Sequence, residues 1–180
     1  GPIYPYYLAN KPSWFKDKYE VRLHYDASGF VSYPKYSGSN LIIKRQLFDK
    51  VGMFDTALGV KGRKVFYGEE TAFLLSAKEM NCSFYYDKNL IIEHLVPDYK
   101  MNVLFPFLAQ FRSGQTAYRL NKTDDITLSS DIATSVDDFF NELNKTLTEN
   151  PNDWEQIAWE KLSHDFKTIG YLTEVNKSLY

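Results

Sequence analysis

The sequence predicts an α/β protein whose last third is helical. Short apolar runs bounded by turn residues predict strands near 29–33 and at 41–43, 83–86 and 90–92. Apolar residues at helical spacing predict helices at 45–51, 69–81 and 101–120. Two more apolar stripes predict helices in the tail, at 132–147 and 151–169.

Local signals define these elements further. The first 36 residues are rich in Tyr, Pro and Trp and lack periodicity, which predicts irregular structure broken by prolines. Gly52 is expected to stop the first helix. Glu69 and Glu70 fall in the first turn of the next helix, where the helix dipole favours negative charge. Asn150-Pro151 predicts a cap followed by proline in the first turn of the last helix.

Composition excludes several classes of function. The 180 residues are enough for one domain. The formal net charge of -2 argues against a nucleic-acid partner. Cys82 is the single cysteine, which excludes an internal disulfide and a Cys-rich zinc site. No apolar run approaches the ~20 residues of a transmembrane helix. The aromatic share of 17% fits a bulky core, or a groove in which rings stack on sugars.

Three sequence features lie close together and suggest a site. They are Gly38-Ser39-Asn40, then 51–55 (Val-Gly-Met-Phe-Asp) leading to Gly68-Glu69-Glu70, and finally His94 after a predicted strand. Each alone has an ordinary structural explanation: paired acids complement a helix dipole, and a single histidine is usually structural.

Taken in order, these features resemble the second half of family 2 glycosyltransferases, which have the GT-A (nucleotide-diphospho-sugar transferase) fold. The resemblance covers about residues 37–120. Within this range, Arg112-Ser113-Gly114 also follows the pattern of bacterial members. It implies transfer of a sugar from a nucleotide-sugar donor to a hydroxyl of a glycan or lipid-linked acceptor, with inversion at the anomeric carbon. In such enzymes a carboxylate at the end of the acidic motif is the general base. By position this is Glu70, with Glu69 as the runner-up.

The resemblance also implies ligand-binding residues. His94 matches a position that ligates Mg²⁺ or Mn²⁺ in some GT-A enzymes. The loop at Gly59–Arg63 is similar to one that closes near the donor. Lys61, Arg63 and Lys64 could neutralise diphosphate charge there, although a solvated basic loop explains them equally well. Substrate contacts are further expected at Asn40, Trp14, Tyr67 and Tyr99.

The first half of the family pattern is not found in this sequence. Neither an Asp-x-Asp motif in the right place nor a nucleotide-binding βαβ region is present, so the chain is expected to be a truncated form whose partner is the missing N-terminal half. The expected parts are 3–120, the acceptor and catalytic part, and 121–180, the helical tail. Gly1-Pro2 is interpreted as a tag scar. A cytoplasmic location is expected, with a peripheral position at the inner membrane face as an option.

One alternative comes from a different class of function. A non-catalytic carbohydrate-binding or scaffold domain that has kept the glycosyltransferase core would show the same motifs. It predicts glycan binding that depends on neither nucleotide nor metal.

Overall fold

The computed structural model describes residues 1–61, 64–65, 67–120 and 132–178 and divides into two compact units. The first unit consists of Gly1–Lys11, Lys16–Gly59 and Gly68–Pro97. The second consists of Pro12–Phe15, Val60–Tyr67 and Asp98–Tyr180. The mixed α/β class predicted from the sequence is confirmed.

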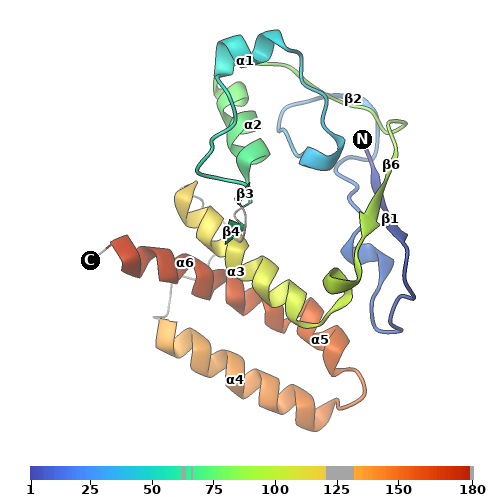
Figure 1. Ribbon diagram of the computed structural model, residues 1–180, viewed down its shortest axis with the longest axis vertical. Coiled ribbons are helices and arrows are strands. Elements are labelled where there is room, and N and C mark those ends of the chain that lie inside the picture. Colours follow the sequence, from blue (N-terminus) through green and yellow to red (C-terminus); the bar gives the residue numbers. More distant parts are fainter. Residues whose placement is uncertain (62–63, 66, 121–131, 179–180) are drawn as a thin grey trace. The chain divides into compact units, whose positions relative to one another are not determined.

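The first unit is mixed α/β. Its elements are β1 (Ile3–Tyr7), the 3-10 turn η1 (Asp17–Tyr19), β2 (Gly29–Val31), the 3-10 turn η2 (Gly38–Asn40), α1 (Gln46–Val51), α2 (Glu69–Glu79), β5 (Phe84–Tyr86) and β6 (Ile92–Val96). β1 pairs in parallel with β6, and β2 pairs antiparallel with β5 (Figure 1). Because the strands of the parallel pair are far apart in sequence, the long intervening chain folds back as α1 and α2.

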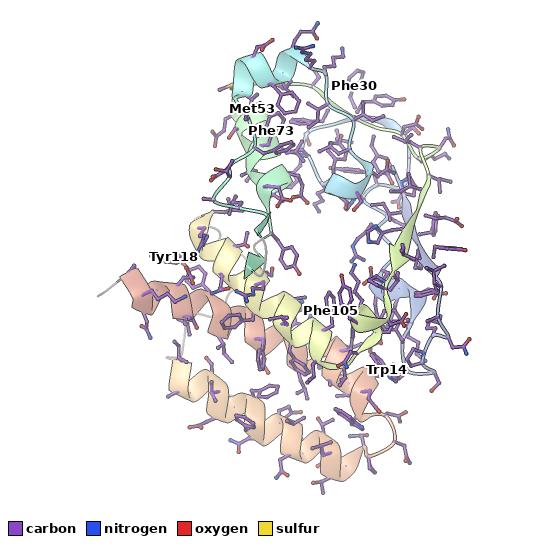
Figure 2. The ribbon with its side chains drawn as sticks, viewed as in Figure 1. Trp14, Phe30, Met53, Phe73, Phe105 and Tyr118 are labelled. Atoms are coloured by element: carbon purple, nitrogen blue, oxygen red, sulfur yellow. The ribbon has the colours of Figure 1, made fainter. Side chains whose placement is uncertain are left out.

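Apolar and aromatic contacts hold α1 against α2. Gly52 ends α1 in a positive-φ conformation (φ 96°) that suits glycine, and the chain then returns toward α2. Phe54 contacts Phe48 of α1 and Phe73 of α2, with ring centroids 5.8 and 5.1 Å apart (Phe73 is labelled in Figure 2). Asp55 Oδ1 accepts a hydrogen bond from the Ala57 amide and shapes the loop that follows.

The second unit is mainly helical. Its elements are β3 (Val60–Lys61), β4 (Lys64–Val65), the 3-10 turn η3 (Asp98–Met101), α3 (Leu104–Arg119), α4 (Ile132–Glu149), α5 (Trp154–Glu160), the 3-10 turn η4 (Leu162–His164) and α6 (Asp165–Ser178). Phe107, Phe139, Ala158 and Leu162 form its buried core. Among the described residues, no helix is long and apolar enough to cross a membrane.

Two glycines let α3 and α6 pack closely (Figure 1). A methyl group added at Gly114 would lie 1.9 Å from the Lys167 carbonyl oxygen, and one at Gly170 would lie 2.0 Å from that of Phe111. Each glycine therefore faces the backbone of the other helix, and neither position has room for a side chain. As a result, α3 packs with the tail helices, whereas the sequence placed it with the preceding 3–97.

Several predicted elements differ from the structure. Residues 41–43 form no strand, although Leu41 has an extended backbone, and Ile42 is 81% exposed. The predicted strand 90–92 begins only at Ile92, so His94 lies inside β6 and not after it. Met80 is exposed at the end of α2. Hydrophobicity predicts that such segments bury apolar side chains, but it does not identify the partner strand.

The tail also departs from prediction. The last predicted helix is divided into α5, η4 and α6 by non-helical angles at Lys161, and α5 starts at Trp154, beyond the expected Pro151. On α3, Leu104 and Leu108 are exposed, whereas the small residue Gly114 and the polar residue Gln115 are buried on the packed side of the helix. On α4, Phe139 is buried as expected, while its neighbour Phe140 and Leu147 are exposed.

Candidate functional site

The first unit brings the Gly38-Ser39-Asn40 turn against Glu70. The turn is η2, and a methyl group added at Gly38 would lie 3.5 Å from both Cδ and Oε1 of Glu70. The Glu70 carboxyl group therefore lies beside the turn, at a distance where a methyl group on Gly38 would be in ordinary van der Waals contact with it. These residues are 32 positions apart by their numbers, and the resemblance predicted no such contact.

Asn40 links this turn to the rest of the unit by two hydrogen bonds. Its side chain is buried, and its Nδ2 donates to the Pro2 carbonyl oxygen at 3.1 Å and to the Leu90 carbonyl oxygen at 2.8 Å. Both amide hydrogens are thus engaged by backbone just before β1 and β6. Asn40 was predicted to contact substrate; the structure gives its amide nitrogen a structural task, because these bonds fix the surface on which Glu70 rests.

Glu70 and Glu69 begin α2 and face different segments. Gly68, with φ 95°, precedes the helix, and both acids occupy its first turn, where unpaired amides favour negative charge. The Glu69 carboxyl group lies against Gly59, where an added methyl group would be 3.2 Å from its Cδ. The two predicted candidates for the base are therefore distinguished by position: only Glu70 lies on the Gly-Ser-Asn turn.

The Glu70 carboxylate is half-buried and keeps its lone pairs available. Among the described residues, no hydrogen bond or ion pair engages it. A carboxylate that is partly shielded from water and not neutralised by a cation can accept a proton from a hydroxyl placed within hydrogen-bond distance. Chemically, the arrangement can serve a proton transfer.

His94 lies on the inner side of β6. Its neighbours Glu93 and Leu95 are exposed, while His94 is half-buried on the same side as Val96, and its backbone is in register with Pro5 of β1. Within the described ranges, no three His, Cys, Asp or Glu side chains come together as a metal site. His94 alone does not fit a Mg²⁺ or Mn²⁺ centre, which needs several oxygen or nitrogen ligands. Its metal role stays a prediction.

The basic loop falls partly outside the described residues. Arg63 lies there, so its predicted contact with the donor has no structural counterpart. Lys61 and Lys64 are opposite each other in the β3–β4 hairpin of the second unit. The hairpin places the two backbones side by side, and the predicted role of these lysines is untested.

The three aromatic residues predicted to contact substrate all belong to the second unit. Trp14 is half-buried and packs against Phe15 and Trp159, with centroids 5.5 and 5.8 Å apart (Trp14 is labelled in Figure 2). Its ring therefore contributes to an aromatic cluster. Tyr67 and Tyr99 are more accessible, 39% and 65% exposed, and keep ring surface free for a ligand.

Tyr67 is held beside α3. Its amide donates to Thr116 Oγ1 at 3.2 Å. Burial raises the pKa of the Tyr67 hydroxyl, Tyr99 raises it further, and Arg112 lowers it, so both groups lie within electrostatic reach of that hydroxyl. Arg112 is a residue whose role sequence reasoning missed. The one feature of the sequence that could have indicated a role is a positive charge in a helix segment made mainly of apolar and small residues.

A cavity of about 720 Å³ lies in the first unit and reaches Asn40 of the Gly-Ser-Asn turn. Its lining includes Ile42, Leu47, Leu74 and Tyr85, and neither Glu69 nor Glu70. We place the candidate chemistry at Glu70 and not in this cavity, because the cavity lining is mostly apolar and its one acid is Asp87.

Comparison of the chain with known protein families, with curated proteins and with solved structures finds no match. The assignment of a function therefore depends on the residues and their geometry.

Proposed function

We propose that this chain is the acceptor-side part of an inverting glycosyltransferase, and that Glu70 is its general base. The observation that carries the proposal is the contact between Glu70 and Gly38. It brings the acidic motif and the Gly-Ser-Asn turn, which the family resemblance links only by order, onto one surface with an unengaged carboxylate.

In the proposed reaction, a hydroxyl of the acceptor lies within ~3 Å of a Glu70 oxygen. The hydroxyl oxygen attacks the anomeric carbon of the donor sugar. A new carbon–oxygen bond forms as the bond to the nucleoside diphosphate breaks, and the hydroxyl proton passes to Glu70. The nucleoside diphosphate leaves with the bonding electron pair, and the anomeric configuration inverts.

The chain itself would supply the base and the surface around it. Asn40 would act as a positioning residue, since its two backbone hydrogen bonds fix the turn under Glu70. Donor binding is assigned to the nucleotide-binding half that the sequence predicts to be missing. A divalent cation is not built into the proposed steps, because the described residues do not form a site for one.

The test is Glu70→Gln in the intact protein that contains this chain, assayed by release of nucleoside diphosphate from candidate sugar donors. Loss of a general base is expected to lower turnover by about 10²-fold or more while donor binding, measured by calorimetry, is unchanged. Glu79→Gln is the matched control, because it makes the same change at an exposed position in the last turn of the same helix.

Glu69→Gln discriminates between the two neighbouring acids. Since Glu69 faces Gly59, we expect a much smaller loss of turnover than for Glu70→Gln. Near-normal turnover in Glu70→Gln would remove this residue from the role. Glycan binding that needs neither donor nor metal, together with no transfer in the unaltered protein, would instead support the non-catalytic carbohydrate-binding domain.

A further inference from the structure

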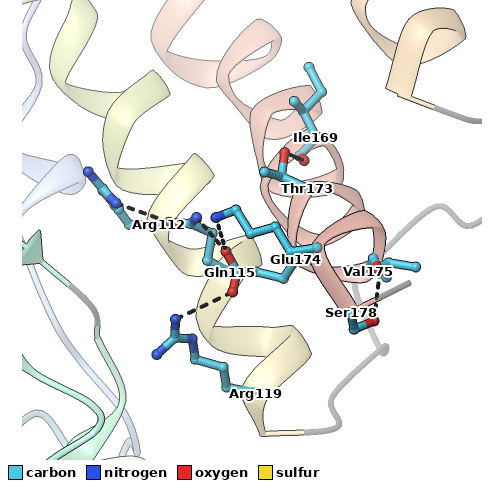
Figure 3. Close-up of polar contacts among 9 residues, drawn as sticks. Arg112, Gln115, Arg119, Ile169, Thr173, Glu174, Val175 and Ser178 are labelled. Atoms are coloured by element: carbon cyan, nitrogen blue, oxygen red, sulfur yellow. Dashed lines mark hydrogen bonds and ion pairs between the residues drawn. The ribbon is translucent and has the colours of Figure 1, made fainter. Parts of the chain in front are cut away.

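Arg112 is a half-buried cation without an acidic partner. It lies on α3, and its Nη1 donates to Gln115 Oε1 at 3.1 Å (Figure 3). Its Nε is buried and has no hydrogen-bond partner. Among the described residues no carboxylate pairs with it. A buried donor of a charged group that is left unsatisfied costs free energy, so its retention calls for a physical reason.

The nearby carboxylate is already used by other cations. Glu174 Oε1 accepts from Lys177 Nζ at 2.7 Å, and Glu174 Oε2 lies 3.4 Å from Arg119 Nη2. Gln115 Nε2 also donates to Glu174 Oε1, at 2.9 Å. The neutral amide of Gln115 thus stands between Arg112 and Glu174 (Figure 3). Two cations, Lys177 and Arg119, therefore share the Glu174 carboxylate, and Arg112 reaches it only through the neutral Gln115 amide.

Tyr67 does not neutralise Arg112. Burial raises the pKa of the Tyr67 hydroxyl above its ordinary value, so it is a neutral phenol near pH 7. Its amide is bonded to Thr116, one helical turn after Arg112 on the same face of α3. Tyr67 therefore contributes a ring and a neutral hydroxyl next to the unpaired guanidinium. Tyr99, which packs on Phe105 with centroids 5.8 Å apart, adds a second and more exposed ring.

We propose that Arg112, Tyr67 and Tyr99 form a binding site for a sugar that carries an oxyanion, a carboxylate or a phosphate. The guanidinium offers its Nη N–H groups to the oxyanion, since its Nε–H is covered by protein. The two tyrosine rings offer apolar faces and hydroxyls to the sugar. This site lies wholly within the second unit, and only the choice of a sugar as its ligand rests on the proposed glycosyltransferase function.

The experiment uses the chain itself and small probes. Glucuronate, glucose and inorganic phosphate are titrated while the Nε–H signal of Arg112 is followed by ¹H–¹⁵N NMR and heat by calorimetry. We expect glucuronate to bind with a Kd of the order of millimolar and to move the Arg112 signal, since one ion pair and one ring stack give weak affinity. Glucose, which has no oxyanion, should bind at least ~10-fold more weakly.

Variants separate this site from general charge attraction. Arg112→Met removes the guanidinium and should weaken glucuronate binding ~10-fold or more. Arg112→Lys keeps the charge but not the planar set of N–H donors, so its affinity should lie between those of the unaltered chain and Arg112→Met. Arg45→Met is the matched control: it makes the same substitution on an exposed residue of the first unit and should leave affinity unchanged. If Arg112→Met does not fold, the Arg112→Lys affinity and the Nε–H shift in the unaltered chain decide.

Each outcome has a defined meaning. Equal binding of glucose and glucuronate, undiminished binding in Arg112→Lys and Arg112→Met, or an unmoved Arg112 signal would overturn the site. Binding of phosphate but not glucuronate would support the oxyanion and assign it to a phosphate-linked ligand. Glu70→Gln should bind glucuronate normally. Full turnover in Glu70→Gln would sink the proposed base and leave this binding site standing.

Discussion

Replacing Gly114 with alanine tests how closely α3 and α6 pack. The added methyl group would lie 1.9 Å from the Lys167 carbonyl oxygen and 2.8 Å from the Tyr171 amide nitrogen, both backbone atoms that cannot rotate away. Real Cβ atoms essentially never approach another heavy atom closer than 3.0 Å. The two helices must therefore separate by about 1 Å at this crossing, and the ring contacts around it loosen.

The magnitude follows from two opposing effects. Overpacking of a tight interior against backbone costs about 3 kcal/mol at the upper end of the usual range. Alanine regains about 1 kcal/mol over glycine through helix propensity. The free energy of unfolding of the second unit should thus fall by about 2 kcal/mol, which for a unit of this size lowers Tm by roughly 10 °C.

The assay is thermal unfolding by calorimetry, with Gly29→Ala as control, because a methyl group there meets no atom within 4 Å. Gly170→Ala should behave like Gly114→Ala, and the double variant should lose less than the two single losses combined, since helices already separated by one methyl group accommodate the other. An unchanged or raised Tm in Gly114→Ala would refute the close packing. Strict additivity would show that the two glycines act independently.

Two further predictions concern the first unit. Asn40→Ala removes two hydrogen bonds to backbone carbonyls and should lower the free energy of unfolding by about 1–3 kcal/mol in urea titrations. The control Asn89→Ala, at an exposed position of the same unit, should change the free energy of unfolding by less than about 0.5 kcal/mol. Equal effects of the two substitutions would contradict the structural role of Asn40. Burial, aided by nearby positive charges, lowers the pKa of His24 below its ordinary 6.5, so the unfolded chain takes up a proton more readily than the folded one, and the stability of this unit should fall as pH drops from 7 through 6.5. Melting curves at pH 7 and 5.5 check this, and His24→Gln should flatten the difference; a unit that gains stability on acidification would contradict it.

Periodicity was enough to predict most helices, and turn signals located several of their ends. Gly52 ends α1 as predicted, and Glu69 begins α2, because the torsional freedom of glycine and the helix dipole act locally. The interior of α3 was not predictable in this way. Its buried side is built on Gly114 and Gln115, and only knowledge of α6 explains why small and polar residues, and not Leu104 or Leu108, face the packed side.

The candidate site shows the same division between local and long-range effects. The acidic pair and its helix could be read from sequence, as could the Gly-Ser-Asn turn. Long-range packing, which no local pattern encodes, brings Glu70 beside Gly38. It also determines the backbone groups to which Asn40 donates its hydrogen bonds. Arg112 was overlooked because an arginine in a helix is ordinary until its missing partner is known.

The parallel pairing of β1 with β6 has a consequence for the order of folding. Ile3 is in register with Ile92, and closing a loop of that length costs about 4 kcal/mol of chain entropy before any ladder bond forms. Helices α4 and α5, by contrast, contact elements that lie close to them in sequence and can form quickly. During synthesis the β1–β6 ladder must therefore wait until β6 has left the ribosome, and these two strands should be the last of their unit to gain protection from amide exchange.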